Sequence, residues 1–179
     1  MRYGAREYRY ARPLAEALQV NQQFRRWFLG RTEFASYQDS AILLHEKQRL
    51  VRSPSAENWW RSYWVGSAYQ FKSECGERET DLLAVFEVED EMRFALHVEV
   101  KAPGDRFGVE QARDYNRRAR CWAGAGRNPR TVLPHDMATT VLCCEARFGE
   151  RCAVEASHFA CVVTFEEIAE HLGDFPDPV

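Results

Sequence analysis

Two apolar segments, residues 80–88 and 92–101, most constrain what this chain can fold into. Their β-branched, aromatic and small apolar residues predict two strands. The tripeptide Glu89-Asp90-Glu91 between them predicts a hairpin turn, although it contains no Gly or Asn. Pro103-Gly104 ends the second strand. If the two strands pair antiparallel around this turn, the start of the first lies beside the end of the second.

Three charged residues occupy those two strand ends. Glu99 and Lys101 are two apart and share one face of the second strand, whereas Val98 and Val100 point to the opposite, apolar face. Asp81, at the start of the first strand, is then expected beside them. Charges at the end of an otherwise apolar strand are costly to bury, so they require a functional explanation.

Such a cluster suits the hydrolysis of phosphodiester bonds. Two carboxylates, Asp81 and Glu99, can bind a hard divalent cation such as Mg²⁺ or Mn²⁺ through oxygen. The cation neutralises phosphate charge and lowers the pKa of a bound water. Lys101 can position that water or stabilise developing charge, and the carbonyl of Val100 is a further candidate metal ligand.

The string Glu79-Thr80-Asp81, a hairpin, and Glu99-Val100-Lys101 resembles the PD-(D/E)xK nuclease superfamily. The resemblance implies that Asp81 and Glu99 bind the metal and that Lys101 assists the attacking water. It also implies a restriction-endonuclease-like α/β fold, with a mixed β-sheet core flanked by α-helices. Thr80 stands in place of the Pro of the motif.

The superfamily also tends to place an acid on a helix before the motif. Glu46 is our candidate for this catalytic acid, and Glu33 is a weaker one. The alternative for Glu46 is a solvated helix residue paired with Lys47 or Arg49.

The predicted helix at residues 109–123 adds two polar residues. Gln111 and Tyr115 are four apart and therefore share a helical face. A Gln-x-x-x-Tyr pattern after the motif Lys resembles the RecB-like branch, which implies that both residues bind substrate near the active site. The alternative for Tyr115 is a partly buried core residue.

Basic residues are concentrated between residues 101 and 130. This segment contains eight Lys or Arg residues and three acidic residues, which gives it a local charge of +5 in a chain of formal charge −3. Such a patch can hold a phosphate backbone, and we expect Arg118 to contact the substrate. The alternative is an ordinary solvated helix face. We expect His97 to be a hydrogen-bonded structural residue.

The remaining pattern predicts one α/β domain spanning residues 1–179. We expect helices at 13–29 and 40–50 and one or two strands within 58–71. Two further strands are predicted at 137–145 and 159–164. A last helix should begin at Thr164, with Glu167 completing a capping box.

The six cysteines form no Cys-x-x-Cys pair, which favours reduced, buried thiols. No stretch approaches the roughly 20 apolar residues of a membrane span. The charged N-terminal residues have no apolar segment behind them, so we expect a cytoplasmic protein without a signal peptide or a membrane partner.

The resulting hypothesis is a Mg²⁺-dependent deoxyribonuclease. A chain of 179 residues leaves little room for a sequence-reading module, so a homodimer or partner subunit could supply specificity. Two alternatives stay open. One is a catalytically inactive nuclease fold that binds nucleic acid or a partner, and the other is a phosphodiesterase that acts on nucleotides.

Overall fold

The computed structural model describes residues 5–53, 57–63, 69–75, 79–124 and 127–177. The strands in this part of the chain are β1 (Ile42–Leu43), β2 (Arg61–Tyr63), β3 (Thr80–Glu87), β4 (Arg93–Lys101), β5 (Met137–Cys144) and β6 (Cys161–Thr164). The α-helices are α1 (Ala5–Val20), α2 (Gln22–Gly30), α3 (His45–Arg52), α4 (Lys72–Cys75), α5 (Gln111–Trp122), α6 (Ala146–Arg151), α7 (Ala153–Ala156) and α8 (Phe165–His171). Two 3₁₀ turns, η1 (Ala35–Tyr37) and η2 (Glu89–Glu91), complete the described elements.

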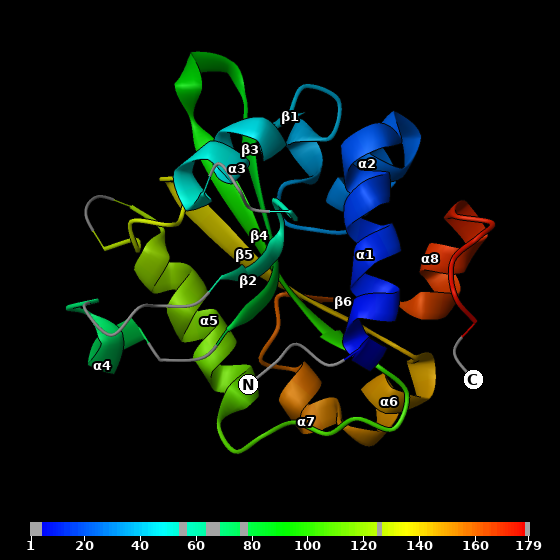
Figure 1. Ribbon diagram of the computed structural model, residues 1–179. Helices are drawn as coiled ribbons and strands as arrows, with labels where there is room; N and C mark the ends of the chain where they lie inside the picture. Colours follow the sequence, from blue (N-terminus) through cyan, green and yellow to red (C-terminus); the bar gives the residue numbers. More distant parts are fainter. Residues whose placement is uncertain (1–4, 54–56, 64–68, 76–78, 125–126, 178–179) are drawn as a thin grey trace.

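The strands form one mixed sheet in the order β1-β3-β4-β5-β6, with β2 also paired to β3 (Figure 1). β3 and β4 are antiparallel, whereas β4, β5 and β6 are parallel to one another. The predicted α/β class with a mixed sheet flanked by helices is therefore confirmed. No helix in the described part of the chain is both long and apolar enough to cross a membrane.

Helices cover both faces of the sheet because the strands are apolar on both sides. α1, α2 and α8 pack with Leu82, Leu96 and Val141 on one face. α5 packs on the other face, where its Trp122 joins Leu83 and its Tyr115 joins Leu142. Figure 1 shows α5 and α1 on opposite sides of the central strands.

The hairpin that positions the site is confirmed. β3 and β4 pair from Leu82↔Val98 to Glu87↔Arg93, and the connection is the 3₁₀ turn η2. Glu91 adopts a positive φ of 61° there, which lets the chain reverse without a glycine.

A glutamine side chain completes the outer edge of β3. β1 and β2 pair with different parts of β3, and Gln48 of α3 lies between them. Its Nε2 donates to the carbonyl of Leu83 at 3.0 Å, and its Oε1 accepts from the amide of Val85 at 2.8 Å. The side-chain amide thus takes the place of a strand peptide.

Two helices predicted in the N-terminal third are present in part, but their predicted bounds are wrong. Residues 13–29 are parts of two helices, because Asn21 caps α2 by accepting from the amide of Phe24 at 3.0 Å. Pro13 lies inside α1 and not at its first position. The helix predicted at 40–50 is replaced by β1 followed by α3, since pairing with β3 holds residues 42 and 43 extended.

The other elements follow the prediction more closely. β5, β6 and α8 lie within about two residues of their expected bounds, and the capping box between Thr164 and Glu167 is present. Of the strands expected within 58–71, the structure gives β2, while residues 64–68 lie outside the described part. The short helices α4, α6 and α7 were not predicted.

The prediction that all cysteines are reduced is wrong. Cys75 of α4 and Cys121 of α5 form a disulfide, which their Cα separation of 5.4 Å permits. Cys143 and Cys144 are free, buried and on opposite faces of the sheet.

Candidate active site

The start of β3 and the end of β4 bring the three motif residues together. The pairing Leu82↔Val98, continued by one residue, puts Asp81 opposite Glu99. Oδ2 of Asp81 accepts a hydrogen bond from the amide of Val100 at 2.9 Å. Nζ of Lys101 lies 2.6 Å from Oε1 of Glu99. The predicted cluster of Asp81, Glu99 and Lys101 is therefore present.

All three side chains are withdrawn from solvent. Asp81 is 7% exposed, Glu99 1% and Lys101 3%. Burial of this kind strengthens every charge interaction among them, because little water remains to screen it.

Opposing effects act on the charge of Lys101. Burial lowers the pKa of its ammonium, but Glu99, Asp81 and Glu7 together outweigh burial, and the pKa of Lys101 ends above its usual value. Lys101 is therefore protonated at neutral pH. Its ammonium also lies 5.3 Å from the centre of the Phe107 ring, within range of a cation–π interaction.

For Asp81, burial and neighbouring negative charges together set the pKa of the carboxyl. Burial raises the pKa of its carboxyl well above the usual range, and the negative charges of Glu99 and Glu7 raise it further. The hydrogen bond from Val100 and the charge of Lys101 act in the other direction and are weaker. The metal-free cluster therefore disfavours a negative charge on Asp81.

Glu7 is a site residue that the sequence did not reveal. It lies near the start of α1, with its Oε1 4.0 Å from Nζ of Lys101. The loop after β4 holds this end of the helix, because Arg6 donates to the carbonyl of Pro103 and lies 3.7 Å from the carboxylate of Asp105. Glu7 precedes Asp81 by 74 residues. A pattern local to the motif could not find it.

Glu46 is placed elsewhere. Its carboxylate pairs with Arg49 of the same helix at 2.9 Å, as the alternative interpretation expected. The Glu46 side chain is 60% exposed and lies two residues from Gln48, on the side of α3 away from the contact between Gln48 and β3. Glu33 is an exposed residue in the segment after α2. The helix acid beside the motif is therefore Glu7, and the prediction of Glu46 is corrected.

Gln111 and Tyr115 do lie on one face of α5, and that face points at the cluster. Nε2 of Gln111 donates to Oε1 of Glu99 at 2.6 Å. The hydroxyl of Tyr115 accepts from the backbone amide of Asp81 at 3.0 Å. Tyr115 is fully buried, and burial raises the pKa of its hydroxyl, followed by the charges of Asp81 and Glu99. These contacts position the carboxylates.

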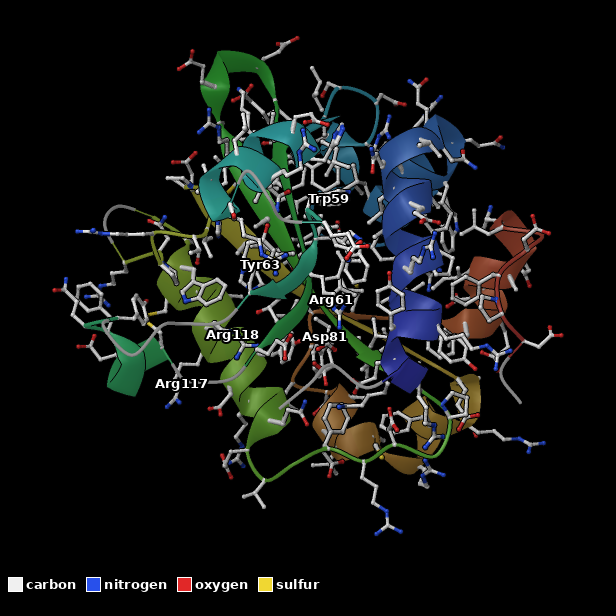
Figure 2. All side chains as sticks on the ribbon, in the orientation of Figure 1. Trp59, Arg61, Tyr63, Asp81, Arg117 and Arg118 are labelled. Carbon is white, nitrogen blue, oxygen red and sulfur yellow. A yellow bond between two sulfur atoms is a disulfide. The ribbon has the colours of Figure 1, made fainter. Side chains whose placement is uncertain are left out.

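Arg118 is buried, so the prediction that it contacts the substrate is wrong, because such contact requires an exposed side chain. Its Nε donates to the hydroxyl of Thr80 at 2.9 Å, and its guanidinium stacks 4.3 Å from the centre of the Tyr115 ring. In Figure 2, Arg118 lies between α5 and the strand that carries Asp81, whereas Arg117 extends outward. Arg118 therefore fixes Thr80, the residue at the Pro position of the motif, and supports the site from behind.

His97 is buried two residues before Glu99, as its strand position implied. The expectation of a hydrogen-bonded histidine is wrong, since neither ring nitrogen has a hydrogen-bond partner among the described residues. The centre of its ring lies 5.3 Å from that of Trp122 and 5.9 Å from that of His135. Burial keeps the pKa of His97 well below its usual value, so the ring is neutral.

One oxygen of the cluster is unsatisfied. Oε2 of Glu99 is buried and has no hydrogen-bond partner of ordinary geometry among the described residues, although the hydroxyl of Tyr115 lies near enough to Glu99 to interact with it. An unpaired buried oxygen of this kind costs about 1–3 kcal/mol, and more when it is charged. Within the described part of the chain, no group of three or more His, Cys, Asp or Glu is arranged to hold a metal ion.

A single Mg²⁺ does not require such a group. It is commonly held by one or two protein carboxylates and keeps several waters. Asp81 and Glu99 could supply those carboxylates, and Oε2 of Glu99 is an oxygen that a cation would satisfy. The amide of Val100 is engaged by Asp81, which leaves its carbonyl as the candidate ligand. The donor set therefore fits the expected ion.

No protein-family model matches this chain, and no curated protein or solved structure matches it significantly. The likeness to PD-(D/E)xK nucleases therefore rests on the motif residues and their arrangement.

Proposed function

We propose that this chain is a metal-dependent nuclease that hydrolyses phosphodiester bonds of DNA at the cluster of Asp81, Glu99 and Lys101. The observation that carries the proposal is the buried carboxylate pair in which Oε2 of Glu99 has no hydrogen-bond partner of ordinary geometry among the described residues. A buried carboxylate oxygen without a partner costs the fold free energy, and a bound cation would offset that cost.

Each residue of the cluster has a role that its surroundings support. Asp81 and Glu99 would hold Mg²⁺ or Mn²⁺, with the carbonyl of Val100 beside them. The ion would neutralise phosphate charge and lower the pKa of a bound water. Glu7 adds a third carboxylate at the edge of the cluster.

Lys101 acts as an electrostatic stabiliser. Glu99 raises its pKa, so it keeps its proton and is a poor general base. As the water oxygen bonds to phosphorus and the bond to the leaving oxygen breaks, negative charge grows on the phosphate oxygens. A buried ammonium beside them lowers the energy of that state.

Gln111 and Tyr115 position the carboxylates. The hydrogen bond from Gln111 fixes one oxygen of Glu99 and leaves the other for the ion. Tyr115 holds the backbone at Asp81. Specificity for a DNA sequence would come from a second copy of the chain or from a partner subunit.

The test is cleavage of labelled linear and circular DNA with Mg²⁺ or Mn²⁺ by the wild type, Asp81→Ala and Glu46→Gln. We expect metal-dependent cutting that Asp81→Ala loses and Glu46→Gln keeps. Cutting of the circle would show internal attack. Absence of cutting by the wild type, with no binding of Mn²⁺, would instead favour a nuclease fold that binds nucleic acid or a partner without catalysis.

A further inference from the structure

A groove of about 560 Å³ runs along the outer side of α5, and none of the described residues that line it is acidic. Its lining residues are basic or neutral and polar: Arg113, Asn116, Arg117, Arg120, Ser157 and His158. A hydrogen bond of 3.4 Å from Nδ2 of Asn116 to the carbonyl of His158 ties α5 to the segment that follows α7. We call this feature the α5 groove.

The arginines of the α5 groove form one helical stripe. Residues 113, 117 and 120 are separated by four and three positions, so their side chains lie on the same face. They span about 10 Å at the helical rise of about 1.5 Å per residue. A strand that keeps the roughly 3.4 Å stacked spacing of a duplex presents about three phosphates over that length, and a more extended strand presents fewer.

These arginines can exchange their present partners for phosphate. Arg113 pairs with Glu110 at 3.2 Å and Arg117 with Asp114 at 2.9 Å, and both arginine side chains are more than half exposed. Such exposed pairs contribute little free energy. A phosphate, which accepts bidentate hydrogen bonds from a guanidinium, is a stronger partner.

The α5 groove leads toward the catalytic cluster. A second hollow of about 330 Å³ shares Arg113 and His158 with it and extends to Gln111. Gln111 in turn donates to Glu99 at 2.6 Å. A path therefore connects the outer face of α5 to the residue that touches the carboxylates; its basic side chains lie at the end formed by the α5 groove, whereas Glu110 and Glu155 line the second hollow.

The burial of the cluster decides which form of nucleic acid can use this path. Glu99 and Lys101 are at most 3% exposed, so the broad surface of a rigid duplex cannot bring a phosphate to them. A flexible single strand can follow a narrow basic groove and bend inward at its end.

We propose that the α5 groove binds the phosphate backbone of single-stranded nucleic acid and leads it to the cluster. The delivery of the strand to the cluster rests on the proposed function, whereas the binding of nucleic acid in the α5 groove does not.

The test is binding of a labelled oligothymidylate in EDTA, measured by fluorescence anisotropy over a range of salt concentrations. The variants are Arg117→Ala with Arg120→Ala, and a matched control, Arg26→Ala, whose side chain is similarly exposed and paired with Asp39 at 2.6 Å. The double variant should bind at least about tenfold more weakly, because charge-assisted hydrogen bonds are lost. Its salt dependence should fall by a slope of about 1.4, roughly 0.7 for each arginine. The control should bind as the wild type does.

Equal binding by the double variant and the control would overturn the proposal. Tighter binding of a matched duplex would overturn the assignment to a single strand, and equal competition by poly-glutamate would indicate a surface for acidic proteins. Because EDTA excludes cleavage, these results are independent of the proposed activity. If the double variant binds weakly and the wild type never cuts DNA, the proposed nuclease activity is contradicted, but the proposed binding role of the α5 groove is supported.

Discussion

Replacing Asp81 with Asn should stabilise the metal-free protein while abolishing its response to metal. Asp81 is buried opposite Glu99 and near Glu7, and these surroundings raise the pKa of its carboxyl. An ionised Asp81 therefore opposes folding. Asn keeps an oxygen that can accept from the amide of Val100, so the substitution removes the charge and preserves the hydrogen-bond geometry.

The magnitude follows from the strand geometry. Directly opposed residues of antiparallel strands are about 5 Å apart. Two like charges at that distance repel by about 3 kcal/mol at an effective dielectric constant of about 20. Weakening the charge-assisted hydrogen bond from Val100 and losing the attraction of Lys101 offset roughly half of this. We expect a net gain of about 1–2 kcal/mol, or several degrees in Tm for a domain of this size.

The pH dependence has a definite sign. The pKa of Asp81 is higher in the folded protein than in the unfolded chain, where it is about 4. The wild type therefore loses stability relative to Asp81→Asn as pH rises above about 4, and the difference levels off above the folded-state pKa.

Metal should reverse the order of the two proteins. Mn²⁺ at about 100 times its dissociation constant would stabilise the wild type by about 2.7 kcal/mol and leave the variant unchanged. Thermal unfolding in EDTA and in Mn²⁺, followed by circular dichroism, measures both effects. A variant less stable than the wild type in EDTA would refute the electrostatic reasoning. A wild-type Tm indifferent to Mn²⁺ would refute the metal site.

Three further changes test other parts of the structure. His97→Phe should flatten the acid sensitivity of the fold, because burial keeps the pKa of His97 low and the wild type loses about 1.4 kcal/mol per pH unit below about 6.5; urea unfolding at neutral and acidic pH measures the slope, and equal slopes contradict the burial argument. Cys75→Ser should cost up to about 4 kcal/mol, because the disulfide to Cys121 closes a loop of 46 residues; an unchanged urea midpoint, with and without reductant, would rule this out. Glu7→Gln should reduce metal-dependent cleavage by roughly 10–100-fold, whereas Glu46→Gln should not, and the opposite result would restore Glu46 to the site.

The sequence predicted the parts of the site that depend on local geometry. The pairing of β3 with β4 follows from two apolar segments and a short turn, and it brings Asp81 beside Glu99. The four-residue spacing of Gln111 and Tyr115 places both on the inner face of α5. Each of these inferences needs only the period of a strand or of a helix.

The remaining features depend on contacts between distant segments. Glu7 reaches the cluster only because α1 packs across the sheet and its first turn is tied to the loop after β4. Six cysteines allow many pairings, and the contact of α4 with α5 selects Cys75 and Cys121. In the sequence, Arg118 is indistinguishable from the other basic residues around it. Only the packing of α5 on the sheet shows that it is buried against Thr80.

Cleavage of labelled single-stranded DNA in Mn²⁺ by the wild type and by Lys101→Met tests the central claim most directly. Met keeps the length and packing of the buried chain but removes the ammonium 2.6 Å from Glu99. We expect the wild type to cut only when metal is present and the variant to lose cutting while still binding the oligonucleotide in EDTA. Undiminished cutting by Lys101→Met would contradict the assignment of catalysis to this cluster.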